Sequence, residues 1–279
     1  MTWTFSTDLA AYLAAARPAV AAQPVVNTGL LTVADALERR GPRAFGDADP
    51  LFGWWTGADG AVDGALLHTP PFPLLLGAAP PEAVRALAGA LGAEPLRGRT
   101  GGFNARRADA QVLAAARGTP TRVVEELRLY RLATLAPPDP TPEGRVRTAG
   151  EADLPLLREW IEAFDRECGI PAGPSEARLR DRISYGGLLL WELDGRPVSL
   201  AGFSRPIGGA SRVGPVYTPL AHRGHGHAAG VTHAASRAAY AAGAAEVLLF
   251  TNLANPTSNG VYQRLGYAPV EDRVVLEAV

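Results

Sequence analysis

The chain has 279 residues, of which 47% are hydrophobic and 20% are charged, and its formal net charge is -1. This composition predicts a folded protein with a substantial core and excludes extended disorder, and the near-zero charge argues against a nucleic-acid-binding or membrane-surface role. The length suits one large domain or two of ordinary size.

Cysteine content and the N-terminal sequence bear on the compartment. Cys168 is the single cysteine, so no internal disulfide can form, and a reducing environment is expected. The N-terminal residues lack the basic start and apolar core of a secretory signal, and no stretch is long and apolar enough to cross a bilayer. We therefore expect a cytoplasmic protein that does not insert into membranes.

The N-terminal half predicts an alternation of strands and helices. The spacing of Leu9, Leu13 and Ala16 suits a short amphipathic helix. Further along, hydrophobic periodicity and turn residues predict strands at 51–56, 65–68, 74–76 and 123–132, and helices at 80–91 and 108–117.

A proline-rich segment divides the chain. Residues 136–144 contain four prolines in nine residues, which rules out a helix and does not suit a central strand. The sequence therefore predicts a domain at 1–135, a linker at 136–144 and a second domain at 145–279.

The C-terminal half also alternates strands and helices. Asp194 and Gly195 form a tight turn, so the flanking strands should pair as a hairpin. Ser175 is expected to cap a helix, and Gly243 to end one. The predicted strands are 145–148, 188–193, 198–203, 212–217, 246–251 and 270–277, and the predicted helices are 153–167, 175–185, 226–242 and 257–265.

The run from Val213 to Ala228 is the most informative part of the chain. It predicts an apolar strand, a break at Pro219, a glycine-containing turn and the start of a helix. Such a turn directs several backbone N–H groups at one point, at the positive end of a helix dipole, and so favours a phosphate. The spacing is neither a Walker A loop nor a dinucleotide-binding fingerprint.

Arg223-x-x-Gly226-x-Ala228 resembles the pyrophosphate-binding loop of the GNAT superfamily of acyl-CoA-dependent N-acyltransferases. The resemblance implies an α/β fold with a mixed α+β sheet over residues 145–279, in which the strand before the loop splays from its neighbour and offers backbone groups to the pantetheine arm. The residues it assigns to coenzyme A are Val216, Tyr217, Thr218, Arg223, Gly224, His225, Gly226, His227, Ala228, Asn255 and Ser258.

A second block supports the same resemblance. An Asn255-Pro256 step leads into a helix with Tyr262 and then Leu265-Gly-Tyr. By resemblance, Tyr262 lies beside the sulfur of coenzyme A and protonates the leaving thiolate. The alternative is that Asn255 or Thr257 only caps this helix and Tyr262 only packs in the core.

Two other features leave alternatives open. His222, His225 and His227 have a spacing that could suit zinc, but no acid or cysteine lies nearby and a metal would compete with the phosphate loop, so no metal is expected. We expect the latter two histidines to face solvent or the phosphates. For the general base, Glu162, Glu167 and Glu192 are candidates, although each is more typical of a solvated surface acid.

The function expected from this resemblance is direct transfer of an acetyl group from acetyl-CoA to an amine, on a small molecule or on a protein N-terminus or side chain. The N-terminal half lacks the phosphate loop and is expected to be a degenerate copy of the same fold that binds no coenzyme. A longer acyl donor, a catalytically silent CoA-binding sensor or structural module, and a homodimer remain open.

Overall fold

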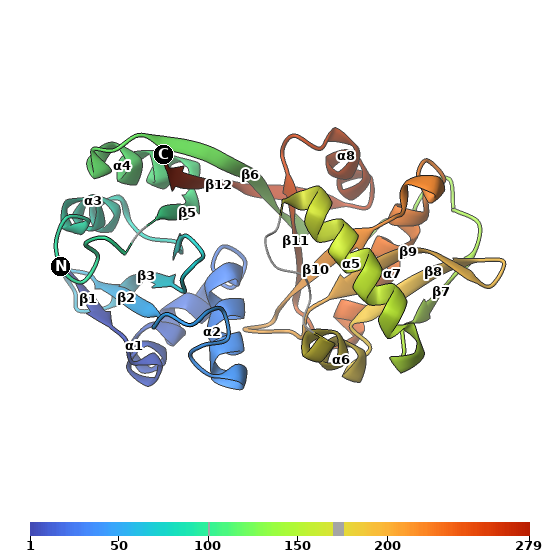
Figure 1. Ribbon diagram of the computed structural model, residues 1–279, viewed down its shortest axis with the longest axis horizontal. Helices are drawn as coiled ribbons and strands as arrows, with labels where there is room; N and C mark the ends of the chain where they lie inside the picture. The colour runs from blue at the N-terminus through green and yellow to red at the C-terminus, as the bar shows by residue number, and fades with distance from the viewer. Residues whose placement is uncertain (100, 170–175) are drawn as a thin grey trace. The chain divides into compact units, whose positions relative to one another are not determined.

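The computed structural model describes residues 1–99, 101–169 and 176–279 (Figure 1). The chain forms two compact units. Unit 1 comprises Met1–Leu129, Asn252–Ala254 and Val270–Val279, and unit 2 comprises Tyr130–Thr251 and Asn255–Pro269. The predicted N-cap at Ser175 lies outside the described residues.

Unit 1 is built on a mixed sheet flanked by helices. The strands are β1 (Thr2–Ser6), β2 (Leu51–Thr56), β3 (Val62–His68), β4 (Leu74–Leu76), β5 (Gly102–Arg106) and β6 (Thr121–Leu132), and the helices are α1 (Leu9–Ala22), α2 (Thr28–Arg40), α3 (Pro81–Ala90) and α4 (Arg107–Arg117). Three of these elements, β1, α2 and β5, were not predicted from the sequence.

The core of unit 1 follows from alternation along its strands. The sheet order is β1-β2-β3-β4-β5-β12, antiparallel throughout except for the parallel β4–β5 pair. Leu66, Leu74 and Phe103 bury their side chains on one face against Leu87 of α3 and Leu113 of α4. Burial of these side chains stabilises the unit by about 1.5–3 kcal/mol each.

Unit 2 repeats this plan. Its strands are β7 (Arg145–Thr148), β8 (Leu188–Leu193), β9 (Arg196–Phe203), β10 (Ala210–Tyr217), β11 (Glu246–Asn252) and β12 (Tyr267–Ala278), and its helices are α5 (Leu154–Cys168), α6 (Glu176–Ser184), α7 (His227–Ala241) and α8 (Pro256–Arg264). All of the helices and strands predicted for this half are present, with ends shifted by a few residues.

The sheet of unit 2 is covered on both faces, with α5 in front of the strands and α7 behind them in the view of Figure 1. Leu157 and Trp160 of α5 pack with Leu190 of β8 on one face. Val231 and Ala235 of α7 pack on the other, in a cluster with side chains from β8, β9, β10 and β11. The small residues of α7 let this helix approach the sheet closely.

The two halves of the chain share one order of elements, strand-helix-helix-strand-strand-strand-helix-strand-helix-strand. The last strand of each half of the sequence lies beside a strand of the other half. β12 begins in unit 2, but Arg273–Glu277 pair with Gly102–Arg106 of β5 in unit 1. In unit 2, β6 is the neighbour of β11, and Arg131 of β6 forms an ion pair with Glu246 of β11.

The compact units therefore divide the chain differently from the predicted boundaries at 135 and 145. Residues 136–144, predicted as a linker, belong to unit 2. Pro142 lies against Gly230 of α7, whose Cβ, if present, would be 2.8 Å from the proline ring. The carbonyl of Glu143 accepts a hydrogen bond from the indole of Trp191 at 2.8 Å. This segment is packed onto the unit.

No helix among the described residues has the length and apolar character needed to span a bilayer.

Candidate functional site

The sheet of unit 2 opens between β10 and β11. These parallel strands pair only from Ala210–Arg212 to Glu246–Leu248, although β10 continues to Tyr217 and β11 to Asn252. Beyond Arg212, within the described part of the chain, β10 pairs with β9 and no longer with β11, across an irregularity between Val213 and Val216. The predicted splay of this strand is thus present, and it leaves edges of both strands without each other as partners.

The predicted phosphate loop lies directly after β10 and ends at the N-terminus of α7. The first bond of the helix runs from the N–H of Gly230 to the carbonyl of Gly226, so the N–H groups of residues 227–229 have no acceptor within the helix. Within the described part of the chain, the N–H groups of Gly224, His225 and Gly226 also have no backbone acceptor. These consecutive donors and the helix dipole form a site suited to a diphosphate.

The two glycines of this loop are required by backbone conformation. Gly224 has φ +84° and Gly226 has φ +77°, in the left-handed region that other residues adopt at a cost. A Cβ at Gly224 would meet no atom within 4 Å. Conformation, rather than steric space within the protein, therefore explains glycine at position 224.

The side chain of Arg223 binds within the protein. Its Nε donates to the carbonyl of Thr218 at 2.8 Å, and its Nη2 donates to both carboxylate oxygens of Glu167 on α5, at 2.9 and 2.7 Å. The guanidinium also lies over the ring of Tyr217. Arg223 thus holds the loop against the end of β10 through Nε and Nη2, and its predicted contact with a phosphate falls to Nη1.

The loop histidines differ in exposure. His227 is buried and, among the described residues, its Nδ1 has no hydrogen-bond partner. Of its two expected orientations, the one toward solvent is therefore wrong, and the one toward a phosphate stays a prediction. The ring of His227 stacks on that of His225 at 5.7 Å. Burial, and next the neighbouring His225 and His222, lower the pKa of His227, so this side chain is neutral at pH 7. Among the described residues no three His, Cys, Asp or Glu side chains are grouped as metal ligands.

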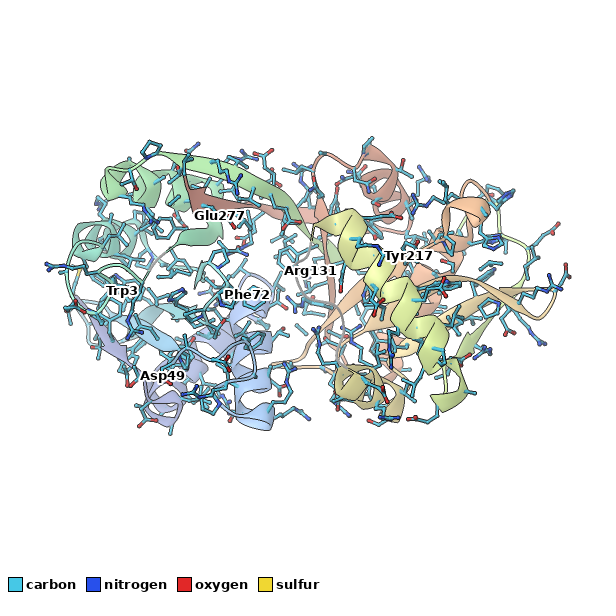
Figure 2. All side chains as sticks on the ribbon, in the orientation of Figure 1. Trp3, Asp49, Phe72, Arg131, Tyr217 and Glu277 are labelled. Carbon is cyan, nitrogen blue, oxygen red and sulfur yellow. The ribbon has the colours of Figure 1, made fainter. Side chains whose placement is uncertain are left out.

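The end of β10 carries three of the predicted contact residues. Val216 pairs with Ala201 of β9, and Tyr217, labelled in Figure 2, packs beside Trp160 of α5. The carbonyl of Tyr217 accepts from the hydroxyl of Ser199, and that of Thr218 from Arg223. These two carbonyls are already bonded, which leaves N–H groups as the main-chain partners for a ligand.

Asn255 caps helix α8. Its Oδ1 accepts from the N–H of Ser258 at 3.0 Å, and its carbonyl accepts from the side chain of Asn259. The capping interpretation of Asn255 is therefore correct for its side-chain oxygen. The predicted contact of Asn255 and Ser258 with a ligand stays a prediction that depends on the amide nitrogen and the serine hydroxyl.

Tyr262 lies on α8 and packs in the core cluster with Tyr267, at 6.1 Å between ring centroids. Burial raises its pKa well above the usual value of about 10, with a smaller contribution from the neighbouring Cys168 thiol. The phenol is therefore protonated across the physiological range, which a proton donor to a thiolate requires.

The acids proposed as general base differ in their surroundings. Glu192 is buried and accepts a hydrogen bond from Arg147 at 2.6 Å, so its interpretation as a solvated surface acid is wrong. Glu167 is half exposed and paired with Arg223. Asp165 on α5, which the sequence analysis did not single out, has its pKa raised by partial burial. Its position two residues before Glu167 gave no signal of this in the sequence.

Two arginines near the strand opening were also missed. Arg182 of α6 donates to the carbonyl of Gly214 at 2.6 Å, and Arg212 of β10 lies over the ring of Phe250 of β11. Because all 27 Lys and Arg residues of this chain are Arg, an arginine carries little information in the sequence.

The comparisons with known proteins agree with this architecture. Residues 154–267 match the model described as the acetyltransferase (GNAT) family. No curated protein is similar enough in sequence to match.

Solved structures resemble the chain along its whole length. An acetyltransferase from the GNAT family of Colwellia psychrerythraea is 14% identical, covers 100% of this chain and 99% of its own, and has a TM-score of 0.65. A GCN5-related N-acetyltransferase from Sphaerobacter thermophilus is 18% identical over 98% of this chain and 94% of its own, with a TM-score of 0.62. A third, from Kribbella flavida, is 22% identical over 77% and 86%, with a TM-score of 0.54.

At these identities the structures establish a common fold. The family match covers residues 154–267, and this segment, most of unit 2, is the part of the chain that is similar to the GNAT acetyltransferase family.

Proposed function

We propose that unit 2 is an N-acetyltransferase that uses acetyl-CoA and acts on an amine, in a cytoplasmic protein. The observation that carries the proposal is the run of unpaired N–H groups at residues 224–229, next to the opening between β10 and β11. The loop is suited to the diphosphate, and the opening offers the edge of β10 to the amide groups of the pantetheine arm. The acceptor is a small-molecule amine, or an N-terminus or side-chain amine of a protein.

Acetyl transfer requires the amine to be held next to the thioester and a proton donor for the leaving thiolate. A neutral amine attacks the thioester carbonyl, a C–N bond forms and the C–S bond breaks. The thiolate takes up a proton, and the nitrogen releases one to solvent, so the proton donor can be restored. Tyr262 is proposed to supply the proton that the thiolate takes up, since its raised pKa keeps the phenol protonated. Holding amine and thioester together supplies much of the remaining rate enhancement.

We propose further that unit 1 is a degenerate copy without coenzyme. The equivalent of the opening lies between β4 and β5, where Arg273 of β12 donates to the carbonyls of Leu76 and Asn104 at 2.7 and 3.0 Å. Arg273 is buried, and its hydrogen bonds occupy backbone acceptors that a pantetheine arm would otherwise use at this edge.

The helix that follows β4 supports the same conclusion. α3 has Pro80 as its N-cap and Pro81 in its first turn, and neither residue has an N–H to offer. The N–H of Ala78, just before the prolines, donates to the side chain of Asn27 at 2.8 Å. Of the donors that a phosphate would need at this helix start, those of residues 80 and 81 are thus missing and that of Ala78 is already used.

The test is calorimetry with coenzyme A together with release of its thiol from acetyl-CoA across a panel of amines. Tyr262→Phe should keep coenzyme A affinity and lose about 10²- to 10⁴-fold in turnover, the usual contribution of a general acid. Tyr240→Phe, on α7 and partly exposed, is the matched control and should behave as the wild type.

Binding of coenzyme A without turnover of any amine would favour the alternative of a silent acyl-CoA sensor. Absence of binding would exclude both.

A further inference from the structure

The face of unit 2 covered by α5 and α6 carries two arginines that converge on the strand opening. Arg182 lies on the inward side of α6, one turn after the buried Leu179. Its guanidinium lies against Gly202 of β9, where a Cβ would come within 2.5 Å of Nη1. Glycine at 202 makes room for the guanidinium at the surface of the sheet.

Arg212 reaches the same face from β10. Val213, the next residue, packs in the α7-side cluster, so Arg212 points to the opposite side. Leu249 of β11 is in that same α7-side cluster, and Phe250, under the Arg212 guanidinium at 6.0 Å, faces the α6 side with it. The positive charge of Arg182 and, more strongly, burial lower the pKa of Arg212 to about 10.

Among the described residues neither arginine is ion-paired, since no carboxylate lies within 4.0 Å of the guanidinium nitrogens of Arg182 or Arg212, and the sequence of 170–175 contains no acid. The charge of Asp181 acts on Arg182 from a greater distance, but Asp181 pairs with Arg205. Neighbouring arginines do have such partners: Arg180 pairs with Glu176, and Arg205 with Asp181. A half-buried pair of like charges is costly unless an anion joins it.

The two arginines also stand at the right place for an acceptor. Arg212 is the last residue of β10 that pairs with β11, so it marks the closed end of the opening. Arg182 holds the carbonyl of Gly214, two residues further along the separated stretch of β10. A molecule that approaches the opening from the α6 side meets both guanidinium groups.

From this juxtaposition we infer that the acceptor is an amine that also carries a carboxylate, and that Arg182 and Arg212 bind the carboxylate while the amine faces the thioester. The inference rests on the proposed acetyl transfer and names its substrate class. Arginine suits this role because its planar donors match the two oxygens of a carboxylate. Phe250 supplies an apolar surface beneath Arg212.

The experiment uses the full chain saturated with free coenzyme A and measures binding of matched amines by calorimetry. The pairs are an amino acid and the same amine without its carboxyl group, and a dipeptide and its C-terminal amide. The wild type should bind the carboxylated member of at least one pair about 10- to 100-fold more tightly, as expected for charged hydrogen bonds.

Variants assign the preference to the arginines. Arg212→Gln should abolish the preference while coenzyme A affinity is kept, and Arg212→Lys should keep part of it. Arg180→Gln is the control, because Arg180 lies on α6 with Arg182 but pairs with Glu176 at the surface. It should keep the preference. Gly202→Ala, which displaces the Arg182 guanidinium, should weaken the preference in a second way.

The outcomes separate the two proposals. Equal binding of both members of every pair, or a preference that survives Arg212→Gln, overturns the inference and leaves acetyl transfer standing. Tighter binding of an aminoalkyl phosphate than of any carboxylated amine also overturns it. Failure of coenzyme A itself to bind, measured first in the same cell, overturns both.

Discussion

Replacing Gly224 by alanine tests the loop that the proposed function depends on. Gly224 has φ +84°, and a Cβ there would meet no atom within 4 Å, so the substitution introduces conformational strain and no clash. A left-handed conformation costs an alanine about 1–2 kcal/mol. If the loop keeps its conformation, this cost lowers the free energy of unfolding. If the loop relaxes, its N–H groups diverge and binding of coenzyme A must restore them.

The loss in free energy of unfolding and the loss in free energy of coenzyme A binding should therefore sum to about 1–2 kcal/mol. If the loop relaxes fully, the whole cost falls on binding and weakens the affinity for coenzyme A by about 5- to 30-fold. Urea denaturation measures the change in stability, and calorimetry measures the change in affinity. Gly195→Ala is the control: Gly195 has φ +75°, also meets no atom within 4 Å, and lies in the β8–β9 turn. It should lose stability and keep its affinity. Wild-type stability together with wild-type affinity in Gly224→Ala would refute this reasoning.

Three further results are expected. Arg273→Met should destabilise the protein by about 3–5 kcal/mol in urea denaturation, because it leaves Glu271 buried without its partner; a loss below about 1 kcal/mol would contradict this. The hydrogen bonds from Arg147 lower the pKa of Asp153, so its stabilising contribution is complete above about pH 4 and is lost as the pH falls through the lowered pKa. Asp153→Asn should therefore flatten the acid side of the stability profile, and an unchanged slope would count against it. Because the pKa of Tyr262 is raised, kcat should show no fall that depends on this phenol up to about pH 10, as a pH–rate profile compared with Tyr262→Phe would reveal.

The C-terminal half could be predicted closely because its local signals agree with its tertiary structure. Asp194 and Gly195 both have positive φ in the turn where the hairpin was predicted. The glycine turn between β10 and α7 could be predicted because glycines at fixed spacing indicate backbone conformation; its binding of a phosphate stays a prediction.

Other features depend on partners distant in sequence. Glu192 was interpreted as a surface acid because its partner, Arg147, lies 45 residues away. His227 could not be recognised as buried, since nothing local tells a helix-start histidine that faces the sheet from one that faces solvent. The unpaired state of Arg212 likewise emerges only when the sheet is assembled.

In the N-terminal half, the missed elements have weak local patterns. β5 begins at Gly102 and includes Asn104 and Arg106, residues that are uncommon in strands. α2 was not predicted, although it carries an apolar face with Leu30 and Leu37. The exchange of β12 into unit 1 had no signal at all, because an alternating strand does not specify which edge it joins.

The course of β12 has a consequence for any attempt to divide the gene. A polypeptide ending near residue 135 would lack Val270–Val279, and its β5 would expose a bare edge with apolar side chains, which invites aggregation. A polypeptide starting near residue 145 would lack Tyr130–Leu132 of unit 2. Its residues Val270–Val279 would have no β5 to pair with and would be prone to aggregation. Each fragment produced alone should therefore aggregate. The two fragments produced together in one cell should associate and give a soluble protein.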